Sequence, residues 1–371
     1  QEQYPPDAQK GLRQFSLAEV AYFLGVTQST IKKLHLERKG PEPQTSPTGR
    51  RSYSAVQMLE LRAYLDQHGR PGKRRYLPHR TEGEELHVIS VVNFKGGSGK
   101  TTTAAHLAQH LALKGHRVLA IDLDPQASLT ALHGIQPELD SVSSLYETLR
   151  YDDERQPISA VIRPTNFPNL DIVPASLDLQ EYEYDTPVAL TSRDPSEGRA
   201  FFTRISKALA EVEEQYDVVV IDCPPQLGYL TLTALTASSS VLITVHPQML
   251  DVMSMSQFLL MLGGILRTIR EAGAEMRLKW FRYLVTRFEP TDGPQKQMVG
   301  FLQAMFPNQM LEAQMVKSTA ISDAGITKQT LYEVERAQFV RSTYDRAITS
   351  LNAVNDEIAG LVHQAWGRDV P

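Results

Sequence analysis

The sequence of 371 residues contains one cysteine, Cys223, and no long apolar run. A single cysteine cannot form an internal disulfide or a cysteine-based metal site, and we interpret it as a small buried residue. No stretch of 18 or more apolar residues appears, so the sequence predicts no membrane span. Its first residues, QEQYPPDAQKG, lack the apolar segment of a signal peptide. These absences favour a cytoplasmic protein.

Basic residues are outnumbered over most of the chain and concentrated near its start. Residues 1–80 carry 14 Lys or Arg against 7 Asp or Glu, whereas the remainder carries 24 against 36. A basic segment on an acidic body favours a nucleic-acid-binding module, although a solvated basic arm would have the same composition. The charged stretch at residues 66–86, with Gly and Pro, predicts a linker between a domain at 1–65 and a second domain at 87–371.

The second domain alternates short apolar runs with amphipathic stretches of helical length. Runs of Val, Ile and Leu of this length are typical of strands buried on both faces of a parallel sheet. Their alternation with helices predicts a doubly wound α/β domain with a mostly parallel sheet. The expected strands are residues 87–94, 117–124, 170–175, 217–225, 240–247 and 282–288.

A segment rich in glycine and lysine, KGGSGKTT at residues 95–102, joins the first run to a helical stretch. Amide N–H groups at a helix N-terminus and glycines without a Cβ can cradle phosphate groups. We therefore expect Lys100 to neutralise nucleotide phosphates and the Thr101 hydroxyl to bind Mg²⁺. The usual motif has glycine at position 94, which is Phe94 here, and a second lysine, Lys95, follows. The expected cradle is Gly96, Gly97, Ser98, Gly99, Lys100, Thr101 and Thr102.

Acidic residues follow two of the expected strands. Asp122 and Asp124 fall on the same side near the end of one strand, and Asp222 ends another. Ligands bind at the carboxyl ends of strands in open α/β sheets. One of the first two carboxylates can serve the Mg²⁺ shell while the other orients an attacking water. Asp222 is typical of the acid that holds Mg²⁺ directly or through water.

The N-terminal segment SLAEVAYFLGVTQSTIKKLH, residues 16–35, has the spacing of a helix-turn-helix. Ala21 is the small residue and Gly25 the turn glycine of that motif, and Thr27 suits the N-cap of the second helix. This second helix, at residues 28–35, would lie in a DNA major groove. The residues expected to face the groove are Gln28, Ser29, Thr30, Lys32 and Lys33.

Three segments, KGGSGKTTTAAHLA, DLDPQASLT and DCPPQLGYLTLTAL, resemble the ParA/MinD class of ATPases and specifically ParA-type DNA-partition proteins. With the N-terminal helix-turn-helix, the sequence is similar to the larger ParA subtype. The resemblance implies ATP or ADP with Mg²⁺ as cofactors, hydrolysis of ATP, and an ATP-bound homodimer that binds DNA without sequence preference. It also implies a ParB-type centromere-binding partner that stimulates hydrolysis, and autorepression through operator DNA.

The resemblance implies roles for single residues. Lys95 would reach the nucleotide of the other subunit in the dimer, Lys100 would hold phosphates, and Asp124 would position the hydrolytic water. These three are the expected catalytic residues. The expected Mg²⁺ ligands are Thr101, Asp122 and Asp222.

Further basic residues are expected to bind DNA. The segment PTGRRSYSAVQMLELRAYL resembles the wing and following helix of MerR-type modules, in which Arg50 and Arg51 would contact phosphates. Lys317, in MVKSTAISDA, lies near a position that carries nonspecific DNA contacts in the family. The sequence thus predicts a small all-α winged helix-turn-helix domain in front of the α/β domain.

Other classes fit less well. A membrane-associated positioning ATPase of the MinD kind would need a basic amphipathic helix at the C-terminus, and LNAVNDEIAGLVHQAWGRDVP has few bases. A cluster-assembly ATPase needs paired cysteines. A metabolic ligase or kinase would leave the N-terminal segment unexplained. That segment has an alternative of its own, because a small helical dimerisation domain would show the same exposed basic residues.

Overall fold

A seven-stranded sheet forms the centre of the molecule, in the order β10-β9-β4-β8-β5-β7-β6. The computed structural model describes residues 10–46, 49–69, 76–93, 95–137, 142–192, 200–271, 273 and 278–368. All neighbouring strands pair in parallel except β6, which is antiparallel to β7. The strands are β4 (His87–Val92), β5 (Val118–Asp122), β6 (Arg163–Pro164), β7 (Leu170–Val173), β8 (Val218–Asp222), β9 (Ser240–Val245) and β10 (Trp280–Val285). Each of the six predicted apolar runs contains a strand, so the mostly parallel sheet is confirmed.

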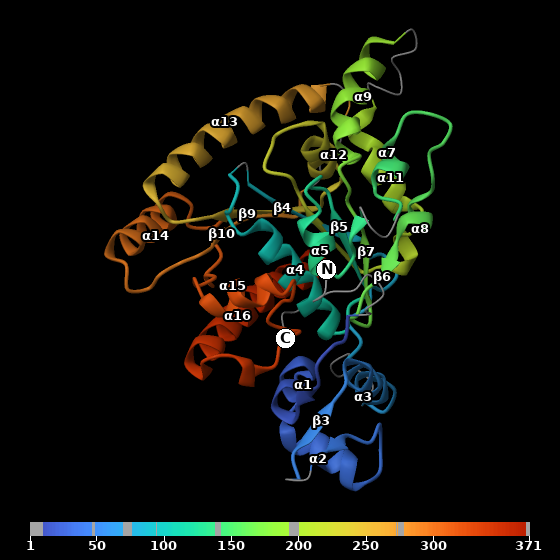
Figure 1. Cartoon of the computed structure of the whole chain (residues 1–371), viewed down its shortest axis with the longest axis vertical. Helices are drawn as coiled ribbons and strands as arrows, with labels where there is room; N and C mark the ends of the chain where they lie inside the picture. Colours follow the sequence, from blue (N-terminus) through green and yellow to red (C-terminus); the bar gives the residue numbers. More distant parts are fainter. Residues whose placement is uncertain are drawn as a thin grey trace.

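Helices cover both faces of this sheet (Figure 1). Alternate strand residues point to opposite faces, so Ile89 joins one apolar core and Val88 the other. The long helices α4 and α16 pack into the first core, and α9, α12, α13 and α14 into the second. The helices are α4 (Lys100–Leu113), α5 (Ser128–Leu132), α7 (Tyr146–Leu149), α8 (Ile158–Val161), α9 (Leu179–Thr191), α11 (Arg204–Ala210), α12 (Tyr229–Ala237), α13 (Met249–Glu271), α14 (Gly293–Met305), α15 (Thr319–Ile326) and α16 (Arg341–Ala365).

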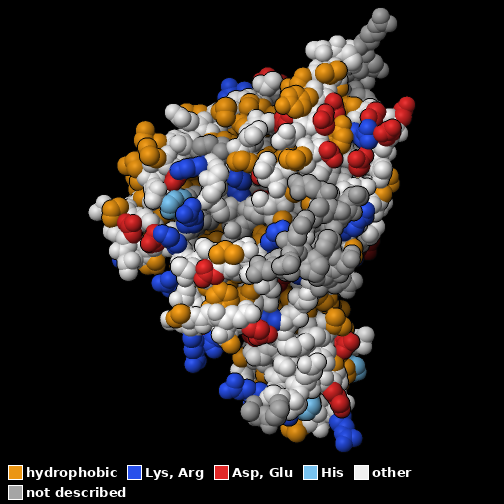
Figure 2. Space-filling view, in the orientation of Figure 1, with side chains coloured by type: hydrophobic (Ala, Val, Ile, Leu, Met, Phe, Trp, Pro, Cys, Tyr) orange, Lys and Arg blue, Asp and Glu red, His pale blue; other side chains and the backbone are white. Residues whose placement is uncertain are grey.

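Helix α13 is long and apolar. In the described part of the chain it is the one helix long and apolar enough to cross a membrane, with a mean hydropathy of 1.6 over Met249–Thr268. One of its faces packs on the sheet through Val252, Met255 and Phe258. The opposite face is exposed, and hydrophobic side chains gather along the arch that α13 forms (Figures 1 and 2). Such a half-buried pattern is typical of a helix that covers a sheet.

Residues 10–67 form a small unit at one end of the molecule, which we call the N-terminal module (Figure 1). It contains α1 (Leu17–Leu24), α2 (Gln28–Leu36) and α3 (Ala55–Gln67). Short strands β1 (Phe15–Ser16), β2 (Gln44–Thr45) and β3 (Arg51–Tyr53) pair in the antiparallel order β1-β3-β2. The expectation of an all-α module is therefore wrong, because strands of two or three residues are too short to show a periodic pattern in the sequence.

The module packs directly on the rest of the chain, which we call the α/β body (residues 87–368). Phe23 of α1 joins the same apolar core as α4 and α16. The Arg62 guanidinium donates hydrogen bonds to the carbonyls of Phe23 (2.7 Å) and Tyr76 (2.6 Å). This side chain lies against Gly115, where a Cβ would stand 2.4 Å from Arg62 Cδ. A glycine is therefore required at this contact between module and body.

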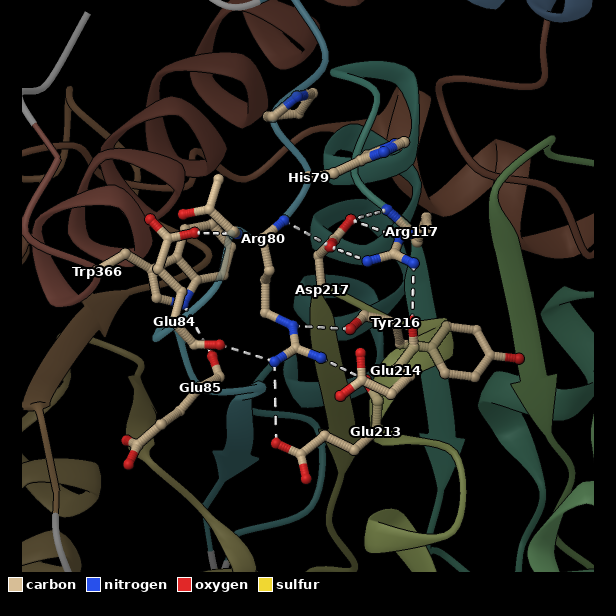
Figure 3. Close-up of polar contacts among 12 residues, drawn as sticks. His79, Arg80, Glu84, Glu85, Arg117, Glu213, Glu214, Tyr216, Asp217 and Trp366 are labelled. Carbon is tan, nitrogen blue, oxygen red and sulfur yellow. Dashed lines mark hydrogen bonds and ion pairs between the residues drawn. The ribbon is translucent and has the colours of Figure 1, made fainter.

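Residues 76–86, part of the predicted linker, form a strap that is hydrogen-bonded to the body (Figure 3). The Arg80 guanidinium donates to the carbonyl oxygens of Tyr216 (3.0 Å) and Glu84 (2.8 Å), and to that of Glu213. The Arg368 guanidinium, beyond α16, donates to the Glu84 carboxylate and to the carbonyls of the strap. The linker prediction did not anticipate these contacts, which fix the strap across the amino ends of the central strands.

Candidate nucleotide-binding site

The predicted phosphate loop lies between β4 and α4, at the carboxyl edge of the sheet. Gly97 and Gly99 have φ angles of 75° and 85°, in the left-handed region that favours glycine. Gly99 is the N-cap of α4, so the unpaired N–H groups of the first helical turn point into the loop. Phe94, at the position where the usual motif has glycine, lies outside the described residues.

Neighbouring strands hold the loop in this shape. The Thr286 hydroxyl donates to the Ser98 carbonyl (2.7 Å), and the Arg287 guanidinium donates to the Gly97 carbonyl (3.0 Å). The Thr244 hydroxyl contacts the Ser98 hydroxyl at 3.1 Å. Three backbone or side-chain oxygens of the loop are thus engaged by neighbouring segments, which fixes the loop in a conformation whose N–H groups could bind an anion.

Lys100 and the loop line a cavity of about 410 Å³. The Lys100 side chain is buried, and burial lowers its pKa, although the carboxylates of Asp222 and Asp124 oppose this shift. Thr101 and Thr102 of the first turn of α4 and Asp124 line the same cavity. The structure therefore brings the predicted phosphate-binding residues together with one of the predicted acids.

Asp122 and Asp222 lie side by side, because they are register partners at the ends of β5 and β8. Both are fully buried. Burial raises the pKa of each carboxyl, and for Asp222 the neighbouring Asp122 charge adds to the shift. Asp122 accepts hydrogen bonds from the Thr130 amide (2.8 Å) and hydroxyl (2.7 Å), which oppose the shift.

The Asp222 carboxyl group has fewer hydrogen-bond donors than that of Asp122. Within the described residues neither of its oxygens has a hydrogen bond of regular geometry, although Thr101 and Lys100 lie near enough to lower its pKa. Two buried carboxyl groups beside a hydroxyl form the oxygen-rich donor set that Mg²⁺ prefers, and a cation would offset the cost of ionising both. The residues predicted as Mg²⁺ ligands thus fit that ion.

Lys95 stands at the mouth of the loop and forms an ion pair with Asp251, in the first turn of α13. About half of the lysine side chain is exposed, whereas Asp251 is buried. His246 Nδ1 lies 3.3 Å from the other Asp251 oxygen. The backbone amide of Lys95 donates to Asn93 Oδ1 (2.9 Å). The lysine is therefore held beside its own loop, and the contact with Asp251 was not predicted.

The far wall of the cavity comes from segments that were not predicted to bind the nucleotide. Thr286 and Arg287 follow β10, Met315 and Val316 come from the segment that leads into α15, and Ile321 lies in the first turn of α15. Thr286 and Arg287 lie near the end of an expected strand, and Met315, Val316 and Ile321 lie in the segment MVKSTAISDA, which was singled out for DNA contact and not for the nucleotide. The apolar members of this wall suit the base of a nucleotide whose phosphates occupy the loop.

Lys317, predicted to contact DNA, lies on this cavity wall. Its ammonium group forms an ion pair with Glu289 (2.9 Å), and half of the side chain is exposed. The structure therefore separates Lys317 from the other predicted DNA-binding residues, and its DNA contact stays a prediction.

The other residues predicted to bind DNA lie on the N-terminal module. Helix α2 begins after Thr27, whose hydroxyl accepts from the Thr30 amide (3.3 Å), as the sequence predicted for its N-cap. The Ser29 and Thr30 hydroxyls also contact the Thr27 hydroxyl, so part of their hydrogen-bonding capacity is used locally. The exposed side chains on α2 and on the turn before β3 include Gln28, Ser29, Lys32, Lys33 and Arg50, with Arg51 half-buried beside them.

The fold and this loop define a P-loop nucleotide-binding protein of the α/β class. A family profile described as an AAA domain matches residues 86–272. The chain is 72% identical over 369 residues to a protein of Sinorhizobium fredii named "Putative replication protein A", covering 100% of this chain and 91% of the relative. It is 34% identical over 236 residues to the chromosome partitioning protein ParA of Myxococcus xanthus, covering 64% of this chain and 77% of the relative. The chain belongs to the family of ParA-type DNA-partition ATPases, in the group of the replication protein A relatives of repABC plasmids.

Solved structures share this fold. Cobyrinic acid a,c-diamide synthase from Mycobacterium smegmatis, with bound ADP and magnesium, is 26% identical with a TM-score of 0.56, covering 77% of this chain and 98% of that chain. A structure described as a partition protein has a TM-score of 0.68 at 21% identity and covers 94% of this chain and 92% of that chain, which shows a shared fold.

Proposed function

We propose that the chain is an ATP-hydrolysing switch that drives DNA partition by changing how the protein binds DNA. The observation that carries the proposal is the phosphate loop with two buried carboxyl groups, Asp122 and Asp222, at its side. The loop amides and Lys100 bind the ATP phosphates, and Thr101 with the two carboxylates holds Mg²⁺. Bound Mg²⁺ neutralises phosphate charge. Asp124, on the cavity wall, positions the water that attacks the terminal phosphate.

Lys95 supplies the switch between subunits in this proposal. Its ion pair with Asp251 keeps it on its own subunit. When two copies meet face to face, Lys95 exchanges this carboxylate for the phosphates of the other subunit's nucleotide. The homodimer forms with ATP and separates after hydrolysis, and a ParB-type centromere-binding partner accelerates that step. The similarity to the ParA relatives supports this cycle.

The N-terminal module supplies the DNA contact that distinguishes this chain from smaller relatives. Exposed Lys32 and Lys33 on α2, exposed Arg50 before β3 and half-buried Arg51 at its start present four cations on one end of the molecule. Neutralising phosphates by Lys and Arg is the main source of affinity for DNA. We propose that this surface binds operator DNA for autorepression, while the ATP dimer binds cytoplasmic nucleoid DNA without sequence preference.

The test of the switch is Lys95→Ala, compared with Lys296→Ala, an exposed lysine on α14. The expected result is that Lys95→Ala still binds ATP but loses ATP-dependent dimers, partner-stimulated hydrolysis and retention on random-sequence DNA. Size-exclusion chromatography with light scattering measures the dimers, and phosphate release measures hydrolysis. If Lys95→Ala dimerises and hydrolyses ATP like the Lys296→Ala control, the proposed role of Lys95 is wrong.

A further inference from the structure

A cleft of about 1000 Å³ lies beside the contact between the N-terminal module and the α/β body. One wall is made of α1 and the start of β3. The other wall is made of the short helix η3 (Arg336–Gln338) and the first turns of α16. On the face drawn in Figure 2, Lys and Arg side chains lie close to the junction between body and module.

The two walls are held in place by polar contacts at the base of the cleft. The Tyr22 hydroxyl donates to the Asp356 carboxylate (2.5 Å), which also contacts Lys114 (2.9 Å). The Arg13 guanidinium donates to the Tyr332 carbonyl (3.1 Å). Because these contacts join α1 to α4 and α16, the two walls form one preformed surface. They are not two units connected only by a flexible linker.

This surface is basic although the whole chain has a net charge of −5. Five arginines and three carboxylates line the cleft. Arg13 is buried and paired with Glu19, so it belongs to the base. Within the described residues, Arg50 and Arg51 have no carboxylate within ion-pair distance. Basic groups therefore remain available on the module wall.

The opposite wall carries its own cations. Arg341 is 81% exposed and Arg336 is 46% exposed. Within the described residues they share one ion-pair partner, because Asp345 pairs with Arg336 through two hydrogen bonds and lies 3.8 Å from Arg341, while the more distant Glu19 charge also acts on Arg336. One acidic group thus partly neutralises two arginines on an exposed surface, where ion pairs contribute little energy and exchange readily.

We infer that this cleft is a DNA phosphate-binding surface, in which Arg336 and Arg341 of the body extend the footprint of α2 and the wing arginines. Guanidinium groups donate two parallel hydrogen bonds to phosphate, so the two arginines exchange Asp345 for the DNA backbone. Asp345 acts as an internal competitor that weakens this contact. The inference rests on the proposed DNA binding of the N-terminal module.

The sharpest test is Asp345→Asn, because a damaged protein would bind DNA less tightly and this variant is expected to bind more tightly. We expect a threefold to tenfold gain in affinity, about 1 kcal/mol, for a fluorescent duplex of random sequence at low salt and without nucleotide, so that the proposed ATP dimer does not contribute. The matched control is Asp153→Asn, an exposed carboxylate between α7 and α8, which is expected to change nothing. Fluorescence anisotropy of the full chain measures both.

The complementary variant is Arg336→Ala with Arg341→Ala. Loss of two phosphate contacts is expected to lower affinity by at least tenfold. The negative slope of log affinity against log salt should become less steep by about 2. Unchanged affinity and slope in this variant, or no gain in Asp345→Asn, would overturn the inference. A variant with Lys32→Ala and Lys33→Ala separates the two proposals. If the Lys32→Ala, Lys33→Ala variant loses binding while the Arg336→Ala, Arg341→Ala variant keeps it, the module binds DNA without the cleft. If the Lys32→Ala, Lys33→Ala variant also binds normally, the proposed function of the module fails first.

Discussion

Two aspartates at opposite ends of strand β8 show how one strand serves two purposes. Asp217 comes just before the strand and Asp222 ends it, and both are fully buried. Asp217 accepts hydrogen bonds from the Arg80 amide (2.9 Å), the Arg117 amide (2.8 Å) and the Arg117 guanidinium (2.6 Å). Burial alone would raise its pKa, but these donors lower it. For Asp222, burial and the Asp122 charge raise the pKa.

The difference shows at which edge of the sheet buried carboxyl groups lack the hydrogen bonds or charges that would stabilise their ionised form. At the amino edge of the sheet, the strap and Arg117 satisfy every oxygen of Asp217, which is typical of a structural contact. At the carboxyl edge, two carboxyl groups are buried together and neither oxygen of Asp222 has a regular hydrogen bond among the described residues, which is costly unless a ligand completes the site. Substitutions at the two ends should therefore separate activity from stability.

The largest expected effect is the loss of activity in Asp222→Asn. Removing a carboxylate that we propose holds Mg²⁺ is expected to slow ATP hydrolysis by about 100-fold or more, equivalent to about 3 kcal/mol in the barrier. The free energy of unfolding without nucleotide should stay equal or increase, because a poorly supported buried acid is removed. Phosphate release and chemical denaturation measure the two quantities. A variant that keeps parental hydrolysis would show that Asp222 does not serve the metal.

Asp217→Asn should show the opposite pattern. The variant leaves the buried face of the Arg117 guanidinium without its anion, which is expected to cost about 3 kcal/mol of unfolding free energy. At temperatures where it stays folded, ATP hydrolysis should remain within a few-fold of the parent. If Asp217→Asn and Asp222→Asn lost hydrolysis equally, the proposed division between a structural amino edge and a functional carboxyl edge of the sheet would be wrong.

The same variant has a defined pH dependence. Because the pKa of Asp217 is lowered in the folded state, its contribution is complete above the unfolded pKa of about 3.9 and is lost as pH falls through the folded value. The stability difference between parent and Asp217→Asn should therefore be largest near neutral pH and shrink in acid. Denaturation series at several pH values measure it, and a constant difference would contradict the assignment.

Arg80→Ala tests the strap itself. Its guanidinium is largely buried and donates to three carbonyls, so its loss is expected to cost about 1–2 kcal/mol. Hydrogen exchange at the amides of residues 76–86 should accelerate, while the phosphate-loop amides keep their rates. Arg155→Ala, at an exposed position, is the control. Uniformly faster exchange across both edges would mean that the strap has no local role.

The smallest expected effect is that of Glu84→Gln. Burial alone would raise the pKa of Glu84, but hydrogen bonds with Arg368 and Thr81 lower it to about 2. The pair is partly exposed, so its loss is expected to cost about 1 kcal/mol or less at neutral pH. Since the pKa is lowered, the cost should be present above the unfolded pKa of about 4.3 and vanish as pH falls towards 2. A cost that grows in acid would contradict this sign.

Much of the site could be predicted because its residues occur in short continuous segments. The loop at 95–102, Asp122 and Asp222 each follow a strand whose apolar run is visible in the sequence. Parallel strands bring their carboxyl ends to one edge, so the sequence order alone indicates that these groups meet. The start of α2 could be predicted for a similar reason, since the Thr27 cap acts within three residues.

The rest depends on contacts between distant segments, which leave no local pattern. Asp251 is far from Lys95 in the sequence, and nothing around it marks a partner. Residues 76–86 are charged and look like a free tether, yet their partners come from the ends of β8 and α16. The three-stranded sheet of the module was missed because its strands have two or three residues.

The single cysteine has a practical consequence for following the switch in solution. Cys223 is fully buried, and burial raises the pKa of its thiol well above the usual range, so at neutral pH it is an unreactive thiol. A cysteine introduced on the surface of the module and another on the body would therefore be the only sites open to a maleimide dye. The natural chain thus provides a nearly silent background for distance measurements between its two parts during ATP turnover.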